Sequence, residues 1–374
     1  MSLGMNLTDS LRPLYIQSLG ASVLQVSFLI SITGLAGTLL RVPSGLISDR
    51  YGRRKIIVIS IALAVFPPLL YTFSAHWEHL IPWGIVYAIA FALYMPSRMA
   101  IVADYTPVAS RIRVYSIMNL AFPLGSLISP TLAGVLENAY GWNAVFYVAT
   151  VLHGIGLVPG LFLPPPPKHK ADEQPASSLD DAAIDLAFVR SLLPFFLLNL
   201  LIGLGMGTVG SITPIYLTDR FKVSTAEVGL FLSVGFGLTT ILTQVPAGIV
   251  ADKFGRRRFI TICLGVMPLF FLLWNVVDNF FLLLPIQMAI NGLWSMTWPA
   301  FISLLMEHVP RSRRGVSSGL TQTGLMLGFT VGPVIGGYLW ETLGTAFPYY
   351  ASAVFFAFCI PILHFLRERG NTKG

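Results

Sequence analysis

The strongest constraint on the fold of this 374-residue chain is a series of apolar runs of about twenty residues. Each run is long enough to cross a hydrocarbon layer of about 30 Å. Two examples are FFLLNLLIGLGMGTVGSITPIYL (195–217) and YYASAVFFAFCIPILHFL (349–366). Within lipid, only helices and closed barrels satisfy their own backbone hydrogen bonds, and these runs lack the alternation of barrel strands. Only 11% of the residues are charged, against roughly 25% in soluble domains. The sequence therefore predicts an all-α polytopic membrane protein.

Charge clusters and Gly/Pro turns divide the chain into twelve expected transmembrane helices. Their predicted ranges are 3–19, 24–48, 56–75, 80–104, 114–136, 143–163, 189–218, 225–251, 259–278, 280–306, 315–339 and 345–366. Between the sixth and seventh helices lies a stretch rich in Pro, Ser and acidic residues, which cannot bury enough apolar surface to fold. We expect an N-terminal six-helix bundle at 1–163, a linker at 164–188 and a C-terminal six-helix bundle at 189–374.

The two halves repeat each other. VPSGLISDRYGRRK starts at Val42 and VPAGIVADKFGRRR at Val245, 203 positions later, and prolines and glycines further along keep this spacing. The first helices align with a two-residue slip, PLYI (13–16) against PIYL (214–217). A spacing that persists over five helices indicates duplication, and so two pseudo-symmetric bundles. In this alignment the first helix starts late and is expected to be truncated: either the true start lies upstream, or this protein tolerates a short first helix.

Basic residues predict the orientation in the membrane. If the two DRYGRRK-like loops are cytoplasmic, the cytoplasmic segments hold 18 of the 24 Lys and Arg residues. This bias predicts a multi-pass protein of the cell membrane with both termini and the linker in the cytoplasm. The net charge of +7 then reflects orientation and contact with anionic lipid, not binding of nucleic acid.

The repeated pattern G-x-x-x-D-[RK]-x-G-R-[RK]-[RK] resembles the signature loop of the major facilitator superfamily (MFS). The resemblance extends over essentially the whole chain, since the twelve helices, the duplication and the central linker match as well. It implies a secondary transporter that works by rocking of two bundles, with the loop residues forming a conformational gate. The residues at the matching positions are Gly45, Asp49, Arg50, Gly52, Arg53, Arg54 and Asp104, then Gly248, Asp252, Gly255, Arg256, Arg257 and Glu307.

These residue types also have a physical rationale. The first glycine of each motif lets a neighbouring helix approach, and the second permits a tight turn. Asp49 and Asp252 end helices, where the helix dipole disfavours a carboxylate unless a cation is near. The resemblance implies that Asp104 pairs with Arg53 or Arg54, and that Glu307 pairs with Arg256 or Arg257. The alternative is that the cations only determine topology.

Four charged residues lie at membrane depth in the first half, where each costs about 2.5–3.5 kcal/mol or more on insertion scales. They are Asp9, Arg12, Arg41 and Arg98, and the second half has Gly210, Thr213, Gln244 and Phe301 at the matching positions. One interpretation is that the arginines hold an anionic substrate group while Asp9 carries a coupling proton. The alternative is that Arg12 extends toward the membrane surface, that Arg41 lies near the cytoplasm, and that Arg98 pairs with a carboxylate of a neighbouring helix.

Polar and aromatic residues supply further candidates for a substrate site. Transporters of this family bind substrate near the membrane midplane, between the two halves. In this chain such a site would be lined by Asn119, Gln244, Asn291, Trp294, Trp298 and Gln322. Simple packing is the alternative for each of them.

The expected function is proton-coupled transport of a small organic solute, and an anion is among the expected substrates. GFTVGPVIGG (328–337) resembles the Gly/Pro-rich stretch of the family's antiporters, which favours efflux by antiport over uptake. The alternative is that this stretch and its weaker copy GSLISPTLAG (125–134) only pack helices closely and have no bearing on direction. GMGTVG (205–210) lies inside an apolar helix and is read as a packing face, not a dinucleotide motif. We expect the protein to be a monomer. We expect it to have no enzymatic activity and to bind neither a metal nor a cofactor. The alternative is a membrane sensor that transports nothing, or an inactive truncated member of the family.

Overall fold

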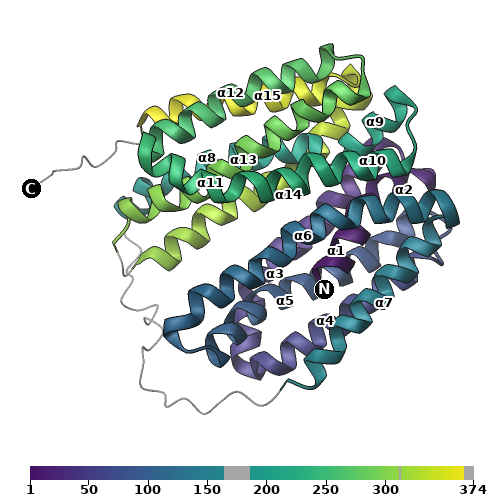
Figure 1. The fold of residues 1–374 in the computed structure, drawn as a ribbon, viewed down its shortest axis with the longest axis horizontal. Helices are drawn as coiled ribbons and strands as arrows, with labels where there is room; N and C mark the ends of the chain where they lie inside the picture. Colours follow the sequence, from purple (N-terminus) through teal and green to yellow (C-terminus); the bar gives the residue numbers. More distant parts are fainter. Residues whose placement is uncertain (164–185, 311–312, 366–374) are drawn as a thin grey trace, which may run out of the picture. The chain divides into compact units, whose positions relative to one another are not determined.

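The computed structural model describes residues 1–163, 186–310 and 313–365, and almost all of them are helical (Figure 1). In these ranges, eleven helices are long and apolar enough to cross a membrane. The chain divides into two compact units, Met1–His169 with Ser211–Leu238, and Lys170–Gly210 with Thr239–Gly374. The prediction of an all-α polytopic membrane protein is confirmed.

The first expected helix is broken into two short ones, α1 (Ser2–Asp9) and α2 (Arg12–Ser18). Pro13 lacks the N–H that would bond to the Asp9 carbonyl, and its ring suits the first turn of a helix. The second half repeats this break, because α8 (Leu186–Gly210) ends and α9 (Thr213–Phe221) begins just before Pro214. The prediction of one continuous helix at 3–19, and of another at 189–218, was therefore wrong in this detail.

The other helices follow the predicted order. The first unit also contains α3 (Val23–Tyr51), α4 (Arg53–Tyr71), the 3₁₀ turn η1 (Trp77–His79), α5 (Leu80–Tyr105), α6 (Val108–Tyr140), α7 (Trp142–Leu161), α10 (Thr225–Leu232) and the π-helix η3 (Ser233–Leu238). The second unit also contains α11 (Thr239–Phe254), α12 (Arg256–Val276), α13 (Phe280–His308), α14 (Arg314–Leu343) and α15 (Phe347–Phe365).

The helices of the two units pack in the same pairs. In the first unit α1 lies on α6 and α7, and in the second α8 lies on α14 and α15. Likewise α4 packs on α5 and α7 where α12 packs on α13 and α15, and α3 packs on α5 where α11 packs on α13. The repeat seen in the sequence is thus a repeat of tertiary contacts.

The π-helix accounts for part of the change in spacing between matching positions of the two repeats. Ser22 with Gln25 and Ser224 with Glu227 form equivalent capping boxes, 202 positions apart. The spacing is 201 before this point, at the PLYI match, and 203 after it, at Val42 and Val245. A π-turn holds one residue more than an α-turn, so η3 between Ser224 and Val245 accommodates the second insertion. The first insertion lies between Leu217 of α9 and the Ser224 cap of α10.

The units differ from the predicted bundles because α9, α10 and η3 belong to the first unit. Gly134 of α6 touches the backbone of Thr225, while Thr131 Oγ1 lies 2.8 Å from Ser233 Oγ. The boundary at 164–188 remains a prediction from the repeat. Residues 164–185 of it lie outside the described ranges, and the remaining three residues belong to α8.

Candidate functional site

A single glycine separates the two helices that flank each repeated motif. Gly52 lies between α3 and α4 with φ 94°, and Gly255 lies between α11 and α12 with φ 84°. Other residues rarely adopt positive φ because their Cβ clashes with the backbone, so the motif needs glycine here. The turn brings the last residues of one helix next to the first residues of the following one.

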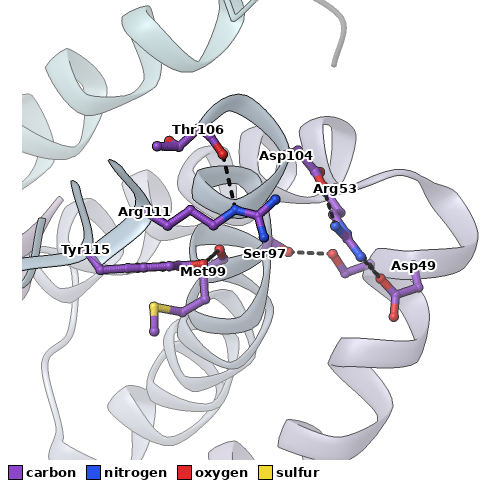
Figure 2. A network of polar contacts seen from close by, with 9 residues as sticks. Asp49, Arg53, Ser97, Met99, Asp104, Thr106, Arg111 and Tyr115 are labelled. Carbon is purple, nitrogen blue, oxygen red and sulfur yellow. Dashed lines mark hydrogen bonds and ion pairs between the residues drawn. The ribbon is translucent and has the colours of Figure 1, made fainter. Parts of the chain in front are cut away.

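Arg53 joins two helix ends in the first charge cluster, which consists of Asp49, Arg53 and Asp104 (Figure 2). Its Nη1 lies 2.6 Å from Asp104 Oδ1, and its Nη2 lies 3.1 Å from Asp49 Oδ1. The carboxylates stand near the C-terminal ends of α3 and α5, and the guanidinium at the N-terminal end of α4. Each charge is disfavoured by the dipole of its own helix, and the pairing compensates for this.

The second charge cluster, Asp252, Arg256 and Glu307, repeats this arrangement. Arg256 Nη2 lies 3.1 Å from Asp252 Oδ1, and Nη1 forms an ion pair with Glu307. The next arginine of each motif has another role, since it donates to carbonyl groups near a helix C-terminus. Arg54 bonds to Leu161 O at 3.3 Å, and Arg257 bonds to Leu363 O at 2.9 Å. In both units, therefore, the arginine directly after the turn glycine, Arg53 or Arg256, binds the carboxylates.

The helices around the first cluster are joined by further polar contacts (Figure 2). Ser48 of α3 and Ser97 of α5 are buried with their hydroxyls 2.9 Å apart, and Tyr115 donates to Met99 O at 2.7 Å. The residues 203 positions after the serines are Ala251 and Ala300, which are buried as well. The two buried hydroxyls of the first unit thus have small apolar side chains at the matching positions of the second.

The close helix approach expected at the first glycine of the motif is not found at Gly45. A Cβ added there would meet no atom within 4 Å, so this glycine does not serve interhelical packing in the structure. The surroundings of Gly248 fall outside the described side chains. Arg50 is exposed and lies over the ring of Tyr51, 5.8 Å from its centroid.

Asp9 and Arg12 form an ion pair across the break between α1 and α2. The Arg12 Nη1 to Asp9 Oδ1 distance is 2.9 Å, and the Arg12 side chain is 14% exposed. Tyr71 and Tyr87 are its other polar neighbours, and Tyr71 in turn accepts a hydrogen bond at its carbonyl from Tyr15. The structure thus places an exposed carboxylate and a half-buried guanidinium on either side of the break between the two helices.

Arg98 is buried in α5, with 9% of its surface exposed. Its Nη2 donates to the carbonyl oxygen of Met118 on α6 at 2.6 Å. Within the described part of the chain, no carboxylate forms an ion pair with it. In these residues the partner of Arg98 is a backbone carbonyl, and its pairing with a carboxylate of a neighbouring helix remains a prediction. Arg41 is only half-buried.

The remaining candidates lie in different surroundings. Asn291 is buried, Gln322 is half-buried, and both Asn119 and Gln244 are exposed. The Trp294 and Trp298 rings lie 6.2 Å apart on α13, and Trp298 stacks on Phe301. These aromatic contacts are those of ordinary packing, and a common substrate site for the six residues remains a prediction.

His153 is a candidate that the sequence analysis missed. It is fully buried in α7, with Nε2 3.2 Å from Tyr87 Oη and Nδ1 2.7 Å from Ala149 O. The available signal was an ionisable ring in the middle of the apolar run 142–161, which otherwise has no charged residue. Tyr87 carries no such signal unless it is compared with Ile290, its counterpart in the repeat.

Comparison with protein families agrees with this duplicated architecture. The model of the Major Facilitator Superfamily matches residues 1–194 and again residues 195–374. The chain belongs to the Major Facilitator Superfamily. It is thus a multi-pass membrane protein of a transporter family, with one charge cluster in each of its two matched segments.

Relatives of this MFS protein include transporters of different kinds. The cis,cis-muconate transport protein of Acinetobacter baylyi is 26% identical, over 86% of this chain and 80% of the relative. The quinolone resistance protein NorA of Staphylococcus aureus is 20% identical, over 99% of this chain and 95% of the relative. A solved bacterial homologue of the human lysosomal transporter Spinster superposes with TM-score 0.83 at 14% identity, covering 98% of this chain and 93% of that one. The last likeness shows the fold alone.

Proposed function

We propose that this MFS protein is a secondary transporter that exports a small organic anion in exchange for protons. The observation that carries the proposal is Arg98, a buried guanidinium with a backbone carbonyl as its partner and no carboxylate among the described residues. Burying an uncompensated cation is costly, so such a group is retained where an anion pairs with it during function. A substrate carboxylate is the matching partner, because its two oxygens fit the guanidinium fork.

The Asp9–Arg12 pair supplies the proton-carrying group in this proposal. When Asp9 takes up a proton its attraction to Arg12 falls, and the contact across the break between α1 and α2 weakens. Two short helices that meet at a proline change their relative direction more easily than one continuous helix. Proton binding would thereby act on the packing of α1 against α6 and α7.

Support for the substrate class and the direction comes from the relatives and from the sequence. The name of the Acinetobacter protein refers to a dicarboxylate, and the name of the Staphylococcus protein refers to drug resistance. The Gly/Pro-rich stretch at 328–337 packs α14 tightly on α8, where a Cβ on Gly332 would lie 2.8 Å from Thr208 N. We place the transporter in the plasma membrane as a monomer, with both termini and the predicted linker in the cytoplasm.

Transport assays in proteoliposomes test this proposal. Vesicles with an imposed proton gradient are loaded with radiolabelled cis,cis-muconate, a quinolone or a cationic dye, and flux is measured in both directions. We expect gradient-driven movement of the carboxylate-bearing compounds opposite to the proton flow, and none of the dye. Flux of the dye alone would point to a cationic substrate, and flux in the direction of proton flow would point to symport. No flux for any compound would favour a sensor.

We further propose that the two charge clusters act as gates, and Arg53→Gln tests this role. The substitution leaves Asp49 and Asp104 without their shared cation, so we expect proton-driven flux to fall about tenfold. The Arg53 side chain is 37% exposed, and exposed ion pairs contribute little to stability, so the thermal unfolding midpoint should change little. Arg50→Gln is the matched control, since this neighbouring arginine lies in the same motif on a tyrosine ring. Equal losses for both variants would show a general effect of positive charge.

A further inference from the structure

Small residues, one every four positions, line the side of α10 and η3 that meets α6. The two backbones touch here, because a Cβ on Gly229 would lie 2.8 Å from Pro130 C and one on Gly237 would lie 2.6 Å from another backbone carbon of α6. Between these contacts, Thr131 donates to Ser233 Oγ from its backbone N at 3.1 Å and from its hydroxyl at 2.8 Å. The seam residues are Thr225, Gly229, Ser233 and Gly237.

The π-turn keeps the last seam residue on this side of the helix. Successive residues of a regular α-helix are about 100° apart, so a spacing of four adds about 40° per step. In such a helix Gly237 would lie about 120° around the axis from Thr225. The extra residue of η3 takes up this rotation, and Gly237 is buried against α6. Removing one residue between Ser233 and Gly237 would therefore leave a regular α-helix with the same four residues on the seam.

The first unit contains a regular helix of this kind. The matching helix α3 is α-helical throughout and has one residue fewer at this point. Its residues Ser27, Ser31 and Gly34 match Gly229, Ser233 and Gly237. The fold thus accepts the regular form at this position of the repeat, and the π-turn of the second half needs another explanation.

Both helices are irregular where they touch. The sequence of η3, SVGFGL, contains two glycines, which weaken a helix relative to alanine. Single π-turns are rare in α-helices and are frequent at functional sites. On α6, Pro130 has no N–H to bond to the Ser126 carbonyl, which weakens that helix as well. Bending is therefore easier here than in the regular turns on either side.

We propose that η3 is a hinge of the transport cycle, at which α10 and α11 change the angle between them. The end of the π-turn coincides with the boundary between the two compact units, since η3 belongs to the first unit and α11 to the second. A continuous helix that passes from one unit to the other would resist a change in this angle, whereas a π-turn accommodates it. This inference rests on the proposed transport function, because a hinge serves a protein that changes conformation.

Deleting Val234 tests the hinge. This residue is half-buried, lies within η3 and is not a seam residue, so the deletion restores a regular helix and leaves the seam in place. We expect the deletion variant to fold and its proton-driven flux in proteoliposomes to fall about tenfold. Val234→Ala is the matched control, because it changes the same side chain but keeps the length of η3. Its flux should equal that of the wild type.

A distance measurement reports the angle directly. Spin labels are attached to Leu230→Cys on α10 and Ile249→Cys on α11, two exposed positions about 28 Å apart along the helix. The buried Cys263 and Cys359 are replaced by alanine. In lipid nanodiscs, without substrate or proton gradient, we expect more than one distance in the otherwise wild-type protein and one narrow distance in the deletion variant.

Several results would overturn the inference. These are wild-type flux in the deletion variant, the same distances in both proteins, or a single narrow distance in the protein with intact η3. A deletion variant that fails to fold would contradict the helical register on which the hinge depends. Because the distances are measured without transport, a lack of flux in the wild type would refute the proposed function alone.

Discussion

Replacing Asp9 by Asn is expected to uncouple transport from the proton gradient, lowering gradient-driven flux by roughly 100-fold. The substitution keeps the size of the side chain but removes the group that gains and loses a proton. Arg12, half-buried beside it at 2.9 Å, would then face a neutral side chain throughout the transport cycle. Exchange of labelled for unlabelled substrate without a gradient should persist, because it needs no change in protonation. The measurement is flux in proteoliposomes, with and without a proton gradient.

Two further variants separate coupling from folding. Asp9→Gly combined with Arg12→Thr installs the residues that the second half carries at these positions, Gly210 and Thr213. We expect this double variant to fold, since α8 and α9 form a similar break with them, and to be uncoupled like Asp9→Asn. Asp219→Asn, at an exposed carboxylate on α9, should remain coupled. A proton-driven Asp9→Asn variant would assign the proton to another group.

Replacing Arg98 by Phe should lower the affinity for an organic anion by roughly 100-fold, the range expected for two charge-assisted hydrogen bonds. Phe is the residue that the second unit has at this position, where Phe301 is fully buried in α13, so the variant is expected to fold. Arg98→Lys keeps the charge but not the planar fork, and we expect a smaller loss, about tenfold. The readout is the KM of anion transport, together with thermal stabilisation by added anion.

Arg41→Gln is the comparison for this experiment. Arg41 is half-buried, and the second half has Gln244 at the matching position. We expect it to raise the KM less than Arg98→Phe does. Equal effects of the two substitutions would mean that the anion responds to the total positive charge of the first unit. An unchanged KM in Arg98→Phe would exclude Arg98 as the anchor.

Most of the fold could be predicted from the sequence because its signals are local and occur twice. The length of the apolar runs gave the helices, and the turn glycines at Gly52 and Gly255 marked the joints between them. The breaks at Pro13 and Pro214 were overlooked, although a proline within a helical run is itself a local signal. The grouping of α9, α10 and η3 with α6 was not predictable, since it depends on contacts between distant segments.

The candidate site was predictable to a smaller extent. The sequence named the residues of both charge clusters but left open which arginine binds the carboxylates, because Arg53 and Arg54 differ by only one helical position. It singled out Arg98 as a charge at membrane depth but not its partner, a backbone carbonyl that no side-chain pattern reveals. His153 and Tyr87 matter through their mutual geometry, and only tertiary structure brings them together.

Contacts of two different kinds lie near the two ends of α6. Near its start lies the first charge cluster, made of ion pairs that dissolved salt screens. Near its other end, Gly134 and Gly229 bring the backbones of α6 and α10 into direct contact, with no charge between them. Ionic strength therefore acts on the ion pairs of the charge cluster and hardly on the glycine contacts. A change in salt concentration is therefore expected to loosen the charge cluster and to leave the packing of α6 on α10 unchanged, which makes salt a selective probe of these two kinds of contact.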